Sequence, residues 1–143
     1  MSSGSIVYDI FKTGVLTGTF QLNGTDSIYL ALVNGYTPSA TDGPTWGSGA
    51  PSTSEVTGTG YTAGGQSIGT TSVGIVGNVA NFALAADVVW SSSTITATGG
   101  VLYDTSQGNA LIAYVDFGGS QSSSSADFTV SWSSGSYLMV TLT

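Results

Sequence analysis

The sequence has no cysteine, no histidine and no arginine, and Lys12 is its only lysine. Without cysteine the chain can form neither a disulfide framework nor a thiolate nucleophile. Without histidine it lacks the base that activates the nucleophile in Ser-His-Asp and Cys-His enzymes. A serine activated by Lys12 is the remaining nucleophilic pair, and Lys12 lies in a segment with weak structural signals. We therefore expect no enzyme activity and no cofactor.

Charge is also scarce. Charged residues make up 6% of the chain, and the formal net charge is −7. A single cation cannot neutralise a row of phosphates, which excludes nucleic-acid binding by counterion release. Attraction to anionic lipid is excluded for the same reason. We expect partners with neutral or basic surfaces, no nucleic acid and no membrane.

Long hydrophobic runs are missing as well. No stretch reaches the roughly 18 consecutive apolar residues of a membrane helix. The start, Met-Ser-Ser-Gly-Ser, has no basic region of the kind that opens a secretory signal. We expect synthesis in the cytoplasm as a soluble chain.

What is abundant points to a compact β protein. Hydrophobic residues make up 41% of 143 residues, 21 residues are glycine, and the mean hydropathy is +0.27. This length suits one domain with one core. We expect residues 1–25 to form an N-terminal helix or arm of the same unit as residues 26–143. The latter predict an antiparallel β-sandwich of about eight or nine strands, because turn signals recur regularly.

Residues 110–117 are the clearest strand, and we place them at the centre of one sheet. Both sets of alternate positions are mainly apolar, as in a strand covered on both sides. The polar loop 105–109 joins this strand to the β-branched run 94–103, which predicts an antiparallel pair. Gly99 and Gly100 indicate a bulge or a close backbone approach in that run. The two alternate sets are Leu111, Ala113, Val115 and Phe117, and Ala110, Ile112, Tyr114 and Asp116.

Shorter elements follow from the same periodicities. Residues 6–16 favour a short helix with Ser5 as its N-cap. Residues 27–33 and 87–90 predict strands. Residues 73–84 predict a hairpin that turns at Gly77-Asn78. Its register sets Val73 opposite Phe82 and Ile75 opposite Ala80.

The C-terminal part predicts two more strands. Residues 127–132 alternate strictly, with Phe128, Val130 and Trp132 on one side. A turn at residues 133–135 then leads to a matching strand. Its half-buried face would carry Leu138, Val140 and Leu142.

Residues 34–54 form a long loop that contains all three prolines and Trp46. A loop of this length inside a compact domain hints at a function or at a contact made elsewhere. Trp46 has two interpretations. It can fold back and cap the core, or it can anchor a neighbouring subunit, since tryptophan is favoured at interface hot spots.

Two patterns with possible chemistry have simpler explanations. Gly58-Thr-Gly-Tyr-Thr-Ala63 has the letters of a dinucleotide-binding fingerprint, but Gly64 and Gly65 follow where a helix should begin, so we interpret it as a turn. Asp104 and Asp116 lie on adjacent central strands and could face each other around a Ca²⁺ ion. Solvated or turn-capping carboxylates are the interpretation we favour, and we expect no bound metal.

Five segments from about residue 26 onward, taken together and in the same order, resemble a family of small virion structural proteins of tailed bacteriophages. The most specific are Gly58-Thr-Gly-Tyr-Thr-Ala-Gly-Gly65 and Leu111-Ile-Ala-Tyr-Val-Asp-Phe-Gly118. In this chain Gln66 follows the double glycine, where lysine is common in the family. The other three segments are Asp26-Ser-Ile-Tyr-Leu-Ala-Leu-Val33 with Tyr36-Thr-Pro38, Asp87-Val-Val-Trp-Ser-Ser-Ser-Thr-Ile-Thr-Ala97, and Asp127-Phe-Thr-Val-Ser-Trp132.

The resemblance implies a capsid decoration (cement) protein at the outer surface of a phage head, where many copies bind the major capsid protein or other virion proteins and stabilise the shell. Symmetry multiplies modest contacts, and clustering at local threefold points would make a homotrimer. The expected docking residues are Ile6, Tyr8, Ile10, Phe11 and Trp46.

Three alternatives remain open. The first is a tail or head–tail junction protein. The second is a carbohydrate-binding or adhesin-like module with exposed aromatic platforms, for which Trp90 and Trp132 are the candidates. The third is a hydrolase with two carboxylates in one cleft.

Overall fold

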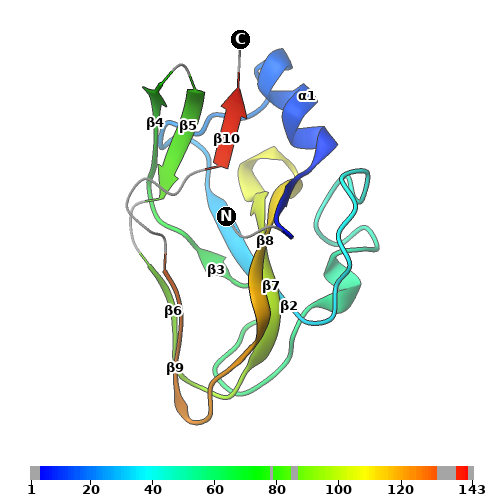
Figure 1. The fold of residues 1–143 in the computed structure, drawn as a ribbon, viewed down its shortest axis with the longest axis vertical. Helices are drawn as coiled ribbons and strands as arrows, with labels where there is room; N and C mark the ends of the chain where they lie inside the picture. Colours follow the sequence, from blue (N-terminus) through cyan, green and yellow to red (C-terminus); the bar gives the residue numbers. More distant parts are fainter. Residues whose placement is uncertain (1–3, 78, 85–86, 132–137, 142–143) are drawn as a thin grey trace.

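The computed structural model of this chain describes residues 4–77, 79–84, 87–131 and 138–141. In these residues the chain forms ten strands, paired antiparallel, and one α-helix (Figure 1). The expectation of a mainly β, antiparallel fold with a short N-terminal helix is confirmed. Asn78, Trp132, Leu142 and the expected turn at residues 133–135 lie outside the described residues.

The largest sheet has five strands, and the predicted central pair lies inside it. The strand order is β1-β8-β7-β2-β3, so both members of the pair have a neighbour on each side. A single 3₁₀ turn, Thr105–Gln107, connects the pair, and Gly108 and Asn109 follow with φ of 64° and 65°. The five strands are β1 (Ile6–Val7), β2 (Ile28–Val33), β3 (Gln66–Ser67), β7 (Thr96–Asp104) and β8 (Ala110–Ser122).

β8 does not keep the strict alternation that the sequence predicts. Leu102 pairs with Ala113 and Tyr103 with Leu111, so Ile112 is an extra residue in a bulge. Because of the bulge, the consecutive residues Ile112 and Ala113 face the same hydrophobic cluster, and Leu111 faces the other one. The prediction that Leu111 and Ala113 share a face is therefore wrong.

A second irregularity, in β7, lies at Gly99 and Gly100, where the sequence predicted a bulge or a close backbone approach. The register shifts between Ala97 and Gly99. A Cβ atom on Gly99 would overlap the ring of Tyr114, and one on Gly100 would crowd Leu30. Both glycines thus allow close packing across the sheet, as expected.

Two smaller sheets complete the fold. The first pairs β6 (Val88–Ser93) with β9 (Ala126–Val130). The second has the order β10-β5-β4 and contains β4 (Thr71–Val76), β5 (Val79–Leu84) and β10 (Leu138–Thr141). In the β4–β5 hairpin Val73 pairs with Phe82 and Ile75 with Ala80, so the predicted register is confirmed.

The expected pairing of the two C-terminal strands is wrong. β10 pairs with β5, and β9 pairs with β6 instead. In that ladder Phe128 lies opposite Trp90 and Val130 opposite Val88, and all four side chains are buried. The apolar face of β9 thus finds a matching apolar face on β6.

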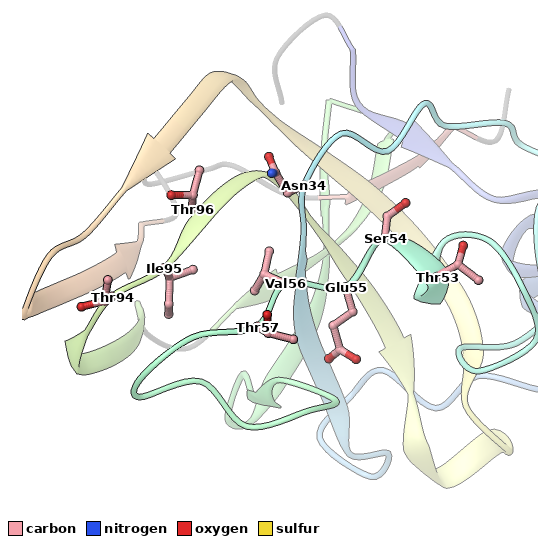
Figure 2. A pocket seen from close by; sticks show the side chains of 9 residues that line it. All are labelled: Asn34, Thr53, Ser54, Glu55, Val56, Thr57, Thr94, Ile95 and Thr96. Carbon is pink, nitrogen blue, oxygen red and sulfur yellow. The ribbon is translucent and has the colours of Figure 1, made fainter.

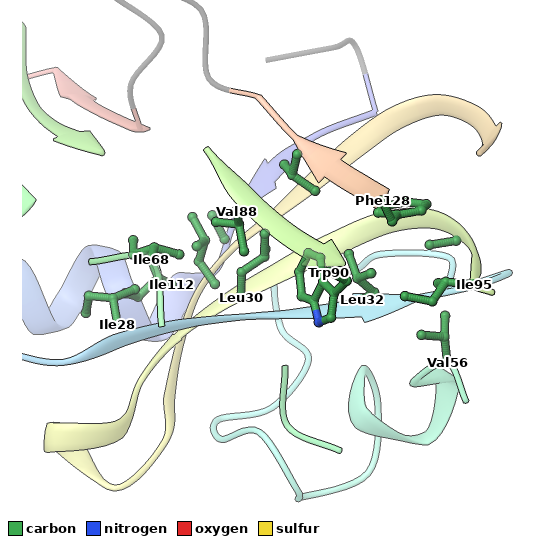
Figure 3. Packing of buried hydrophobic residues seen from close by; sticks show 14 of the residues in the cluster. Ile28, Leu30, Leu32, Val56, Ile68, Val88, Trp90, Ile95, Ile112 and Phe128 are labelled. Atoms are coloured by element: carbon green, nitrogen blue, oxygen red, sulfur yellow. The ribbon is translucent and has the colours of Figure 1, made fainter. Parts of the chain in front are cut away.

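The five-stranded sheet is covered on both faces. One cluster fills the space between this sheet and the β6–β9 pair, with contributions from Leu30, Trp90 and Phe128 (Figure 3). A second cluster covers the opposite face, where Val33 of β2 packs with residues of the long loop that include Trp46. Burial on both sides, predicted for residues 110–117 from their apolar pattern, is confirmed for residues 110–114, whereas residues 115–117 are half-buried.

The helix begins later than the sequence predicts. α1 spans Asp9–Thr17, Tyr8 is its N-cap residue, and Gly18 ends it with φ of 76°. Ile6 and Val7 pair with β8, and the Tyr8 N–H donates to the Ile112 carbonyl at 3.0 Å. This pairing keeps the backbone extended through Tyr8, so the prediction that Ser5 caps the helix is wrong.

Candidate functional site

The residues expected to dock on a partner belong largely to the protein's own core. Tyr8 is fully buried, Phe11 is 2% exposed and Trp46 is 9% exposed, whereas Ile6 and Ile10 are half-buried. The ring of Trp46 stacks on Tyr103, with centroids 5.3 Å apart and an interplanar angle of 9°. Trp46 therefore caps the core, the first of its two interpretations. Contact of these five residues with a partner stays a prediction.

A tyrosine network fixes the long loop to the N-terminal arm. The hydroxyls of Tyr8 and Tyr36 lie 3.1 Å apart, and Tyr36 donates to the Asp42 carboxylate. Burial, reinforced by Asp42, raises the pKa of Tyr36 to about 12. Burial and then the hydrogen bond to Tyr36 raise the pKa of Tyr8 even further. Both tyrosines stay neutral at ordinary pH, and their hydroxyls serve to bind the loop.

The large exposed apolar side chains are other residues, which the sequence analysis did not assign to docking, and they include Leu16 of α1, which is 77% exposed. Val73 and Ile75 of β4 are 57% and 70% exposed, and β4 forms an edge of its sheet (Figure 1). Ser72 and Gly74 are exposed too, so both faces of the middle of this strand are open. A signal was available in the sequence, since no charged residue lies between Glu55 and Asp87. Edge strands without charge or proline are prone to pair with other chains.

A polar groove of about 450 Å³ lies between residues 53–57 and 94–96 (Figure 2). Among the described residues that line it, none is aromatic and Glu55 is the only acid. The groove therefore lacks a stacking platform for a sugar and the second carboxylate that glycoside hydrolysis requires. Its lining consists of Asn34, Thr53, Ser54, Glu55, Val56, Thr57, Thr94, Ile95 and Thr96.

The carboxylate of Glu55 is used to hold the neighbouring loop. It accepts hydrogen bonds from the Tyr61 hydroxyl at 2.8 Å and from the Gly64 N–H. The Tyr61 oxygen in turn accepts from the Leu32 N–H at 3.0 Å. Burial raises the pKa of Tyr61 above its usual range, a rise that Leu32 opposes and Glu55 reinforces. Glu55 and Tyr61 thus fasten residues 58–65 to β2.

The glycines of this loop are explained by close backbone approach. A Cβ atom on Gly65 would overlap the Leu30 carbonyl oxygen, and one on Gly58 would overlap that of Thr94. Gly65 also has φ of +76°, which disfavours other residues. No helix follows Gly65, because β3 begins at Gln66. The interpretation of this glycine pattern as a turn is confirmed.

Asp104 and Asp116 do not face each other. Asp104 pairs with Ala110 beside the hairpin loop, whereas Asp116 pairs with Gly99 far along the ladder. The interpretation with Ca²⁺ between them is therefore wrong. In the part of the chain that the structure describes, no three acidic, histidine or cysteine side chains gather closely enough to hold a metal ion.

Asp104 instead makes a hydrogen-bonded pair with Asp26. Asp104 is fully buried and Asp26 is 8% exposed. Burial, followed by the neighbouring Asp26 carboxyl, raises the pKa of Asp104 to about 7. Burial acts to raise the pKa of Asp26 as well, but hydrogen bonds from Asp104, the Gln21 N–H and Gln107 lower it overall. The sequence analysis missed this pair, because it depends on β2 lying beside β7.

Of the two tryptophans that were candidates for a sugar platform, Trp90 lies in the described part of the chain and Trp132 lies outside it. Trp90 is 4% exposed and packs between Tyr61 and Phe128.

Among the helices in the described ranges, none has the length and apolarity to cross a membrane. Comparison with protein-family models, with curated proteins and with solved structures found no match to this chain.

Proposed function

We propose that this chain is a structural protein of a phage virion, most simply a decoration protein that binds the outside of the head. Two arguments support the proposal. The first is the resemblance of five segments to a virion family. The second is chemical, since these four carboxyl groups serve the fold: Glu55 holds a loop, Asp42 accepts a hydrogen bond from Tyr36, and Asp26 and Asp104 bind each other.

The observation that carries the proposal is the exposed edge strand β4. Val73 and Ile75 present apolar side chains to solvent, and among the described residues only β5 pairs with β4. The free edge offers backbone N–H and C=O groups to an extended segment of a partner. The neighbouring sequence is uncharged on a chain of net charge −7, so a neutral protein surface can approach β4 without desolvating acids. The partner that we propose is the major capsid protein.

A double variant tests this surface. Val73→Ser with Ile75→Ser removes the apolar side chains and keeps the strand. Val89→Ser is the matched control, because Val89 is an exposed apolar residue, 38% accessible, on β6. Each protein is added to phage heads that lack this chain, and bound copies are counted after sedimentation. We expect at least a tenfold loss of occupancy for the double variant and none for the control.

Unchanged occupancy of the double variant would show that β4 is not the docking surface. Electron cryo-microscopy of particles that carry the bound wild-type chain tests the wider proposal. Density for this fold on the outer head surface supports decoration, with threefold clusters supporting the homotrimer. Density at the tail or the head–tail junction would assign the chain there instead. Absence of the chain from purified particles would overturn a virion role altogether.

A further inference from the structure

Two carboxyl groups meet at the end of the five-stranded sheet where β2 begins and β7 ends. Asp104 is the last residue of β7 and pairs with Ile28, the first residue of β2. Asp26 lies two residues before that strand, and its side chain is hydrogen-bonded to that of Asp104. Both acids are buried. Neither takes part in the proposed docking surface.

Backbone and amide donors satisfy most of the carboxyl oxygens. The Gln21 N–H donates to Asp26 Oδ2 at 2.8 Å, and Gln107 Nε2 lies 3.3 Å from both Asp26 oxygens. The Ser106 N–H donates to Asp104 Oδ1 at 2.9 Å. Asp104 Oδ2 is buried, and among the described residues no N–H or hydroxyl group donates a hydrogen bond to it. A hydrogen atom on one of the two carboxyl groups is what completes this contact.

No cation faces the pair among the described residues. β2 and β8 contribute Ile28 and Ala110 next to Asp104, and the hairpin loop contributes the uncharged Ser106 and Gln107. Within the described ranges, Asp26 is the only charged group that acts on Asp104. The chain's single lysine, Lys12, is 3.0 Å from Asp9 in an exposed ion pair. Two full negative charges at this site would therefore repel each other without compensation.

We propose that Asp26 and Asp104 share one proton, and that this proton fixes residues 18–27 to the hairpin loop that follows β7. The two segments are joined at the same place by further bonds. The Ser27 N–H donates to Ser106 Oγ at 2.9 Å, and the Thr105 N–H donates to the Ser27 carbonyl at 2.9 Å. Loss of the proton places a second charge in the centre of this junction. The proton-bound pair therefore contributes less and less to the stability of the fold as the pH rises toward the value at which the folded chain releases this proton.

The direction of the pH effect follows from the raised pKa of Asp104. The unfolded chain releases this proton near the ordinary aspartate value, about 4, whereas the folded chain keeps it until about pH 7. The stabilisation is complete below the unfolded value and is lost as the pH rises through the folded one. Over this window the unfolding constant should rise by up to about tenfold per pH unit. The lowered pKa of Asp26 acts only at more acidic pH.

Asp104→Asn is the informative variant, because its amide can donate to Asp26 without being able to release a proton. Urea unfolding is measured from about pH 5 to pH 8 for the wild type, Asp104→Asn and the control Asp127→Asn, which removes an exposed acid. We expect the midpoint to fall with rising pH in the wild type and the control, and to stay level in Asp104→Asn. An equal decline in all three proteins would overturn the proposal.

Infrared spectroscopy of the folded protein gives a second readout that does not depend on the variant folding. At about pH 6 the wild type should show the carbonyl band of a protonated carboxylic acid, since an ordinary aspartate is ionised there. The band should persist in Asp127→Asn and vanish in Asp104→Asn. Its absence from the wild type would refute proton sharing. So would stabilisation of the wild type at about pH 8 by calcium chloride that is absent in Asp104→Asn, because the pair would then be a cation site.

Discussion

Replacing Trp46 with alanine should destabilise the folded monomer, because this ring is a main part of the cover over one face of the central sheet. The side chain is 9% exposed and stacks in parallel on Tyr103. It belongs to the cluster that also buries Val33 and Leu111. An anchor reserved for a neighbouring subunit would instead be exposed in the single chain. The variant therefore separates the two interpretations that the sequence left open for this residue.

The size of the effect follows from the buried area. A tryptophan side chain buries about 200 Å², and at about 25 cal/mol per Å² this contributes roughly 5 kcal/mol. Stacking on Tyr103 adds about 0.5–1.5 kcal/mol. Partial collapse of the loop into the space lowers the loss, so we expect Trp46→Ala to cost about 3–5 kcal/mol. Trp46→Phe keeps a ring over Tyr103 and should cost clearly less.

Urea denaturation followed by circular dichroism measures these differences, and size-exclusion chromatography with light scattering measures assembly. We expect the midpoint of Trp46→Ala to fall well below that of Trp46→Phe, at every protein concentration. Suppose instead that Trp46→Ala unfolds at the wild-type urea concentration and loses self-association. The burial argument would then be refuted, and Trp46 would be an interface anchor.

Three further predictions concern the loop 58–65 and the acid pair. Tyr61→Phe removes the hydroxyl that bonds Leu32 and Glu55, and it should cost about 1–3 kcal/mol in urea unfolding. Gly65→Ala should be far more destabilising than the matched variant Gly64→Ala, since both have positive φ but only Gly65 lies against a backbone oxygen; equal midpoints would contradict this. Raising the pH from about 5 to 7 should lower the free energy of unfolding by at most roughly 3 kcal/mol, and Asp104→Asn should abolish this change.

The sequence pattern correctly predicted those elements of structure that are determined by residues close together in the sequence. The β4–β5 hairpin follows from apolar residues on both sides of Gly77, and its register came out as expected because a two-residue turn fixes it. Burial of the first five residues of β8 on both faces follows from the apolar run at positions 110–115. The close packing at Gly99 and Gly100 was likewise predictable from the sequence, because two consecutive glycines weaken a strand and usually indicate a bulge or a close backbone approach.

The wrong predictions concern features of the structure that depend on contacts between segments far apart in the sequence. The bulge at Ile112 changes which face of the sheet the following residues of β8 occupy, and no residue type in the sequence indicates it. The late start of α1 depends on pairing of Ile6 and Val7 with β8. The partner of β9 is β6 because both have buried faces, although β10 follows β9 in sequence. Period and turn residues describe single segments, and they do not rank competing partners for a strand.

The acid pair shows the same limit at the level of a site. Asp104 was correctly placed at the end of a central strand, but its partner was assigned from the neighbouring strand of the hairpin. Antiparallel pairing sets Asp104 beside the loop and Asp116 far from it. The hairpin geometry alone could therefore have excluded a contact between Asp104 and Asp116. Finding Asp26 requires the pairing of Ile28 with Asp104, a contact between residues that lie far apart in sequence.

The segments that carry the family resemblance are mainly ones that build the fold. Residues 58–65 are shaped by backbone contacts with β2, with β6 and with the link between β6 and β7, and residues 111–115 fill both cores. Such residues constrain the architecture, and they can stay alike in proteins that bind different partners, because a partner touches exposed side chains. Large exposed apolar side chains are few among the described residues, and Val73 and Ile75 are the pair that shares one edge strand. Under the proposed function, selection of a partner should therefore depend on β4, and transplanting residues 71–76 into a member of the family that this chain resembles should transfer binding while the other segments stay fixed.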